Sequence, residues 1–265
     1  MHRRISFGSV VNLLTLSSAE FAEALAAKPG VIIPIGSIEQ HGPMGLLGCD
    51  TLCAETVAQE AGARGKLLVA PVLAYTSAQF NMDFPGTISV RSRTLMSLIE
   101  DIVDSLHHQG VKGVYFLNAH GANIAPIRSA MHDIYSRLGD SAPRIRCRSW
   151  WDFDAVNVIR EREFGDWEGM HATPSEISIT QKYHRTPDVI AAEEPERKLD
   201  AAFIQNHAGD FHPPAAQHKA EFPDGRVGAH SALASPDAGA AIVDAAATAL
   251  IDDFNAFMKE IQPRK

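Results

Sequence analysis

Strand-like and helix-like segments alternate along most of this 265-residue chain. Short apolar runs at 31–36, 66–72, 111–117 and 144–150 have the length and composition of buried strands. Segments with helical patterns lie between or after them, at 51–63, 94–109, 124–138 and 238–260. Because strands that alternate with helices build βαβ units, this order predicts an α/β fold in which helices flank both faces of a mostly parallel sheet.

One domain is predicted to span residues 1–265, because 45% of the residues are hydrophobic and no repeat or low-complexity tract divides the chain. Ser17 and Glu20 form a capping-box pattern, which predicts that a helix begins there. Residues 186–237 break the alternation with prolines, histidines and small residues. An irregular stretch of this length is usually functional or an oligomer contact.

Neither a nucleic acid nor a membrane is an expected partner. The formal net charge of −8 lacks the basic surface that either would attract, and no apolar segment reaches the roughly 18 residues of a membrane span. Three cysteines are too few for a disulfide scaffold. Ser9, Asn12 and Thr15 interrupt the apolar stretch that a signal peptide would need. We therefore expect a cytoplasmic protein, in keeping with a reducing compartment.

Acidic and histidine side chains follow several of the predicted strands. In open α/β sheets, ligands bind beyond the carboxyl ends of the strands, and carboxylates with imidazoles are suitable ligands for divalent cations. The sequence therefore predicts a metal site at this edge. Its candidate residues are Glu39 and His41 after the first strand, Asp50 at the next helix, His120 after the third strand, and His171 with Glu176 in a later segment.

Each candidate also has an ordinary structural interpretation. Asp50 can cap a helix, Glu39 and His41 can be solvated loop residues, and His120 can be a hydrogen-bonded packing residue. The metal hypothesis depends on their conjunction at one edge. Competing motifs are weaker, since the chain has no Gly-x-Ser-x-Gly elbow, no phosphate-binding loop and no second cysteine pair for structural zinc.

Several motifs resemble those of the creatininase (creatinine amidohydrolase) family. Pro34-Ile-Gly-Ser-Ile-Glu39-Gln-His41-Gly-Pro43, followed by Asp50-Thr51, looks like the opening signature of that family. Phe84-Pro-Gly-Thr-Ile-Ser89, Asn118-Ala-His120-Gly-Ala-Asn123 and His171-Ala-Thr-Pro-Ser-Glu176 follow in the family's order. The resemblance runs from about residue 10 to 250. It implies a three-layer α/β/α fold, hydrolysis of a carbon–nitrogen bond, and a homo-oligomer that is often a hexamer.

The resemblance also implies two divalent metal ions, with zinc, manganese and iron as the candidates. Glu39, Asp50 and His120 would hold one ion, and His41 and Asp50 the other, so that Asp50 bridges both. Ala122 stands where the creatinine-hydrolysing members have a glutamate that completes the second site. We expect Glu176 to supply this ligand instead.

Other positions that differ from creatininase concern the substrate pocket. Trp167 matches a pocket tryptophan, Glu168 replaces an aspartate, and Gly121 stands where creatininase proper has a tyrosine. Phe80 and Asn81 also depart from a frequent Glu-His pair. Because ligands are kept while pocket walls change, the resemblance predicts hydrolysis of a small amide, cyclic or not, other than creatinine. A formamide deformylase and a precursor-peptide peptidase are alternatives within the family.

Two cations sharing a carboxylate would lower the pKa of a bound water towards roughly 7 and polarise an amide carbonyl. His171 is the candidate for moving a proton to the leaving nitrogen, with Glu176 as a second catalytic candidate; alternatively, His171 orients Glu176. Trp167 would form an apolar wall or simply pack. A non-catalytic protein that keeps a metal for structure is the competing class, and it would have a filled coordination shell and no cavity.

Overall fold

The computed structural model describes residues 12–188, 193–195 and 198–261. Most of the segment weighed above as a signal peptide, and parts of the irregular 186–237 stretch, lie outside these ranges. Within them, no helix combines the length and the apolar character that crossing a membrane requires.

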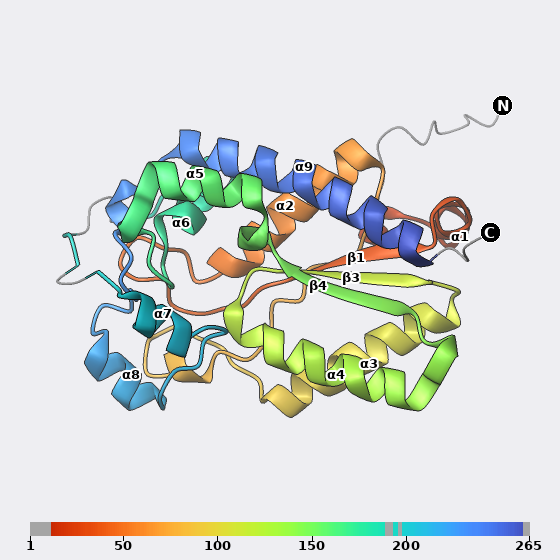
Figure 1. The fold of residues 1–265 in the computed structure, drawn as a ribbon, viewed down its shortest axis with the longest axis horizontal. Helices are drawn as coiled ribbons and strands as arrows, with labels where there is room; N and C mark the ends of the chain where they lie inside the picture. Colours follow the sequence, from red (N-terminus) through yellow and green to blue (C-terminus); the bar gives the residue numbers. More distant parts are fainter. Residues whose placement is uncertain (1–11, 189–192, 196–197, 262–265) are drawn as a thin grey trace.

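Four strands form one parallel sheet in the order β2-β1-β3-β4 (Figure 1). They are β1 (Gly30–Ile35), β2 (Leu68–Val69), β3 (Gly113–Asn118) and β4 (Arg144–Ser149). All four predicted strands are therefore present, although β2 is shorter than the predicted 66–72.

Two prolines shape the edge between β1 and β2. Pro71 has no N–H to donate, and the regular pairing of β2 ends just before it, at Val69. Pro34 lies inside β1, where its carbonyl accepts a hydrogen bond from the Leu73 N–H at 2.9 Å. Its missing N–H faces the same side, beyond the end of β2, so Pro34 does not weaken the pairing of β1 with β3.

Helices cover both faces of the sheet and produce three layers (Figure 1). One face is packed by α2 (Cys49–Gly65), α5 (Asp154–Phe164), α6 (Pro174–Tyr183) and α9 (Pro236–Ile261). The other is packed by α1 (Ser18–Ala27), α3 (Ser92–His108) and α4 (Ile124–Leu138). Ile32 joins the first core and Ile33 the second, because successive strand side chains point to opposite faces. The predicted α/β/α sandwich is confirmed.

The capping box at the start of α1 forms as predicted. The Ser17 N–H donates to Glu20 Oε2 at 2.7 Å, and the Glu20 N–H donates to Ser17 Oγ at 3.4 Å. The helices predicted at 51–63, 94–109, 124–138 and 238–260 correspond to α2, α3, α4 and α9. The prediction did not include α5 or α6.

The described part of 186–237 is more regular than predicted, since it contains α7 (Ala201–Asn206) and α8 (Ala215–Glu221). Both helices lie at the end of the molecule opposite α1 (Figure 1). Short 3-10 helices occupy Leu13–Thr15, Gln79–Asn81, Gly121–Asn123, Gly139–Ser141, Trp150–Asp152, Gly165–Trp167 and Ser231–Leu233.

Candidate metal centre

The predicted metal residues gather where the chain leaves β1 and β3. The segments that follow β1 in sequence pair with it on opposite sides, β2 on one and β3 on the other. In a parallel sheet such a reversal opens a crevice beyond the carboxyl ends of the strands. Glu39 and His41 enter this crevice from β1, and His120 enters it from β3.

Asp50 reaches the crevice because the first turn of α2 passes close to the end of β1. A Cβ on Gly36 would lie 2.3 Å from the Thr51 nitrogen, so only glycine permits this approach. Asp50 does not cap the helix, since Gly48 holds the N-cap position. Its Oδ1 instead lies 2.9 Å from His41 Nε2.

Both central histidines are oriented by backbone carbonyls. His120 Nε2 donates to the Ser77 carbonyl at 2.8 Å, and His41 Nδ1 donates to the Glu39 carbonyl at 3.2 Å. The opposite ring nitrogens then face the carboxylates. His120 Nδ1 lies 3.1 Å from Asp50 Oδ2 and 3.2 Å from Glu39 Oε1. A carbonyl that holds one ring nitrogen and leaves the other for an ion is the usual arrangement of metal-binding histidines.

Glu176 is held in place by the capping box of α6. Thr173 donates to Glu176 Oε2 from its N–H at 2.9 Å and from its hydroxyl at 2.7 Å. Thr173 therefore orients this carboxylate.

Among the residues that the structure describes, three groups of potential metal-binding side chains have ligand atoms within 4.8 Å of one another. Glu39, His41 and Asp50 each belong to two of these groups. Asp50 is the carboxylate that faces both central histidines, since its Oδ1 lies 2.9 Å from His41 Nε2 and its Oδ2 lies 3.1 Å from His120 Nδ1. All members are buried. The groups are Glu39, Asp50 and His120; His41, Asp50 and Glu176; and Glu39, His41 and His171.

The donor set fits divalent cations. Glu39 Oε1 and Asp50 Oδ2 are buried and accept no hydrogen bond, although His120 Nδ1 lies beside both. In the neutral tautomer that Ser77 selects, Nδ1 presents a lone pair to these oxygens, which is repulsive unless a cation lies between them. Buried carboxylates need cationic partners, and mixed carboxylate and imidazole ligands suit zinc, manganese or iron.

The pKa values of the cluster also indicate that its carboxylates need positive charge beside them. Burial opposes a charge on His41, but the Asp50 carboxylate outweighs it and raises the pKa of His41 to about 10. Burial also opposes a charge on His120, yet Glu39 and Asp50 raise its pKa well above the usual value. Burial raises the pKa of Glu176 to about 7. Without a metal ion, the protonated rings of His41 and His120 therefore supply the positive charge that balances the carboxylates.

His171 belongs to the third group and lies beside the two groups that contain Asp50. Its Nε2 donates to the Gln40 carbonyl at 2.7 Å, and its Nδ1 lies 3.5 Å from Glu39 Oε1. Burial, and then the nearby charge of His41, lower the pKa of His171. Its ring therefore stays neutral near pH 7. Within the described part of the chain, the hydrogen bonds that orient Glu176 come from Thr173 rather than from His171.

A cavity of about 260 Å³ adjoins this cluster. Asp50, His120, His171 and Glu176 open onto it, and Trp150 and Trp151 form part of its wall. The predicted wall residue Trp167 is not among the lining residues. Its ring instead packs against His230, with a centroid separation of 5.9 Å, because the turn after α5 points it that way.

The other predicted pocket residues also have defined surroundings. Glu168 is buried behind the lining, where it accepts a hydrogen bond from Arg160 Nε at 2.9 Å and another from Ser175. Gly121 lines the cavity and lies against the carboxylate of Asp210.

Sequence reasoning missed two residues that support the site. Asn81 was noted only as a departure, yet its Nδ2 donates to Glu39 Oε2 at 2.9 Å, and Gln40 Nε2 donates to its Oδ1 at 2.8 Å. Asp210, from the irregular stretch, reaches the cavity. The position of Asn81, three residues before the Phe84-Pro-Gly-Thr motif, could have indicated it, whereas no motif surrounds Asp210.

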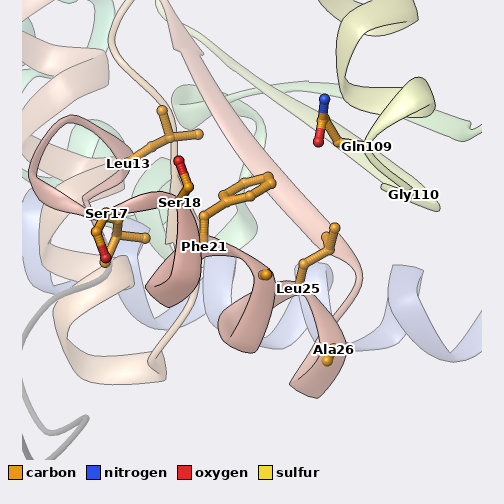
Figure 2. A pocket seen from close by; sticks show the side chains of 10 residues that line it. Leu13, Ser17, Ser18, Phe21, Leu25, Ala26, Gln109 and Gly110 are labelled. Atoms are coloured by element: carbon orange, nitrogen blue, oxygen red, sulfur yellow. The ribbon is translucent and has the colours of Figure 1, made fainter.

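A larger hollow of about 700 Å³ lies at the other end of the sheet, between α1 and the end of α3 (Figure 2). Leu13, Phe21 and Leu25 line it together with small and amide side chains. None of the described residues that line it is acidic, basic, histidine or cysteine. The smaller cavity is therefore the candidate site.

A parallel α/β/α sandwich whose switch point carries a buried carboxylate–histidine cluster defines a class of metal-site proteins. The chain belongs to the creatininase (creatinine amidohydrolase) family, whose model matches residues 14–254. The predicted family is confirmed.

Two curated relatives illustrate the range of the family. A mycofactocin precursor peptide peptidase of Mycobacterium tuberculosis (strain CDC 1551 / Oshkosh) is 32% identical over 126 residues, 44% of this chain. The chain spans about half the length of that relative, 50%. The creatinine amidohydrolase of Pseudomonas putida is 27% identical over 190 residues, 66% of this chain and 72% of that protein.

Solved structures share the fold. A crystal structure of creatinine amidohydrolase (creatininase) has a TM-score of 0.75 at 23% identity and covers 96% of this chain and 99% of its own. Two further solved creatininases, one described as a Zn-Zn type and one as a Mn form, have TM-scores of 0.74 and cover 96% of this chain.

Proposed function

We propose that this protein is a two-metal amidohydrolase that cleaves the carbon–nitrogen bond of a small amide. The observation that carries the proposal is the position of Asp50, which is shared by two groups of potential ligands and has an unsatisfied buried oxygen. Glu39 and His120 complete one group, and His41 and Glu176 complete the other. The adjoining cavity favours catalysis over a purely structural metal, because a structural site is closed.

When bound, the two divalent ions polarise the amide carbonyl and make a nucleophilic water available at neutral pH. The protein supplies the proton transfer. The Gln40 carbonyl holds His171 Nε2–H, so Nδ1 is the nitrogen free to accept a proton and pass it to the leaving nitrogen. Its lowered pKa keeps that nitrogen unprotonated at neutral pH. Trp150 and Trp151 exclude water from one side of the substrate.

The cavity volume favours a small substrate. About 260 Å³ is below the usual size of pockets for drug-sized ligands, so it suits a compact amide. The relatives include a precursor peptide peptidase and a creatinine amidohydrolase, so peptide and cyclic amide cleavage are both options for the family. We favour a small amide other than creatinine, because Gly121 and Asp210 line the cavity where creatininase proper has a tyrosine.

Metal analysis together with an activity screen tests this function. Asp50→Asn removes the shared ligand and is expected to lose both ions. Asp133→Asn, at an exposed position of α4, is expected to keep both. Metal-loaded protein is then screened against creatinine, formamides, small lactams and short peptides. Undiminished metal content in Asp50→Asn contradicts the bridging role. Rapid creatinine turnover contradicts the substrate assignment.

We further infer a homo-oligomer, with a hexamer as the expected state, that works in the cytoplasm. Cys49, Cys53 and Cys147 are free thiols, as a reducing compartment favours. Sedimentation velocity of the metal-loaded protein tests the assembly. A monomer at micromolar concentration contradicts it.

A further inference from the structure

The segment between α7 and α8 brings a carboxylate into the cavity that no sequence motif indicates. Asp210 follows Gly209 and adopts a left-handed backbone conformation, with φ of 55°. Few residues other than glycine, asparagine and aspartate adopt this conformation. It belongs to the turn that directs the side chain inward, where only 12% of it is exposed. Asp210 lines the same cavity as Trp150 and Trp151.

This carboxylate rests on the backbone that follows His120. Asp210 Oδ2 accepts a hydrogen bond from the Ala122 N–H at 2.8 Å. A Cβ on residue 121 would lie 2.4 Å from the same oxygen, so the absence of a side chain at Gly121 makes room for Asp210. The Ala122 N–H and the space beside Gly121 therefore hold the carboxylate in a fixed position before any substrate binds.

Asp210 stands next to the metal groups without belonging to them. Its Oδ2 lies 3.7 Å from His120 Nδ1, and none of the potential ligand groups found among the described residues includes it. Its other oxygen, Oδ1, lies 3.7 Å from His212 Nε2, which is beyond hydrogen-bonding distance. Asp210 therefore keeps acceptor capacity for a group inside the cavity.

The charged side chains that line the cavity indicate which chemical group of a substrate could bind to Asp210. Among the described lining residues, Arg160 is the only arginine or lysine, and it already donates to Glu168 Oε1 from Nε at 2.9 Å and to Asn157 Oδ1 from Nη1 at 2.8 Å. Because Asp210 is a carboxylate, a substrate ammonium is the cationic group with which it would pair. A charged hydrogen bond in a partly buried site favours such a pairing.

We propose that Asp210 is a substrate-binding residue that accepts a hydrogen bond from a protonated amine close to the scissile amide. The inference rests on the proposed hydrolase function and narrows its substrate class to small amino-amides. Asp210 then recognises the amine while the metal groups face the amide carbonyl.

Calorimetric binding to the metal-loaded protein tests this inference with two probes. β-Alaninamide carries a protonated amine at neutral pH, and N-acetyl-β-alaninamide is its uncharged counterpart. We expect wild-type protein to prefer β-alaninamide. Asp210→Asn keeps the size and the tolerance for the left-handed backbone, and is expected to weaken β-alaninamide binding roughly 10- to 100-fold, the effect of one charged hydrogen bond. Binding of the acetylated probe should change little.

Metal content and a second variant complete the test. Asp210→Gly also suits the backbone conformation and should lose the same preference, while Asp133→Asn should keep it. Equal affinity of wild-type protein for both probes, no binding of either, or loss of a metal ion in Asp210→Asn overturns the inference. If the preference depends on Asp210 but no amide is hydrolysed, the proposed hydrolase function fails and this inference stands.

Discussion

Metal binding to the ion-free protein is expected to release about two protons at pH 7. The pKa of His41 is raised to about 10 and that of His120 well above its usual value, so both rings carry a proton at neutral pH that a metal ion must displace. Glu176, with a pKa of about 7, adds about half a proton. The expected total is therefore roughly 2 to 2.5 protons for the pair of ions.

The apparent affinity for the metal ions should fall as the pH is lowered. Because the pKa values of His41 and His120 are raised, both rings keep their protons at every pH below these values, and the protons compete with the ions. Each released proton weakens binding about tenfold for every pH unit lowered, so the apparent affinity for the ion pair should fall roughly 100-fold per unit between pH 8 and 6.

Titration calorimetry of the apoprotein measures this number. The observed enthalpy is plotted against the ionisation enthalpy of several buffers, and the slope is the count of released protons. His41→Gln should release about one proton fewer, and Asp133→Asn the same number as wild type. A slope near zero for wild-type protein would refute the claim that the carboxylates hold both imidazoles charged.

The remaining predictions address single positions. Glu176→Gln should lose one ion and keep the other, and unchanged metal content would leave this carboxylate without a ligand role. His171→Gln should retain both ions while kcat falls roughly 10²- to 10⁴-fold, the usual effect of losing a general acid–base; an unaltered kcat would assign proton transfer elsewhere. Gly36→Ala should displace the first turn of α2 and lower both thermal stability and metal content, because its Cβ would collide with the Thr51 nitrogen. Wild-type values for Gly36→Ala would show that this close approach does not position Asp50.

Much of the fold is predictable from sequence because it depends on local chemistry. Apolar runs that end at glycine or polar residues predict β1 and β3, and the capping box at Ser17 and Glu20 predicts the start of α1. Local sequence patterns do not predict secondary structure where a segment has neither clear helical nor clear strand periodicity. Asp154–Phe164 has a weak apolar face, so its helix was not predicted, and Pro71 shortens a strand that looked longer.

The candidate ligands were predictable for a related reason. Parallel strands bring their carboxyl ends to one edge, so residues that follow β1 and β3 must be neighbours whatever the loops do. The assignment of Glu176 as the ligand that completes the second group required the family resemblance, because its position depends on the way α6 packs against α2 and α9.

The sequence by itself determined the layered fold, the edge at which polar residues gather, and the identity of most of those residues. Only the tertiary structure decided that Thr173 orients Glu176, that Trp150 and Trp151 rather than Trp167 face the cavity, and that Asp210 reaches it. The physical reason is that hydrogen-bond and side-chain periodicity act over a few residues. The course of a long irregular segment is set instead by the shape and the polar groups of the surface on which it packs.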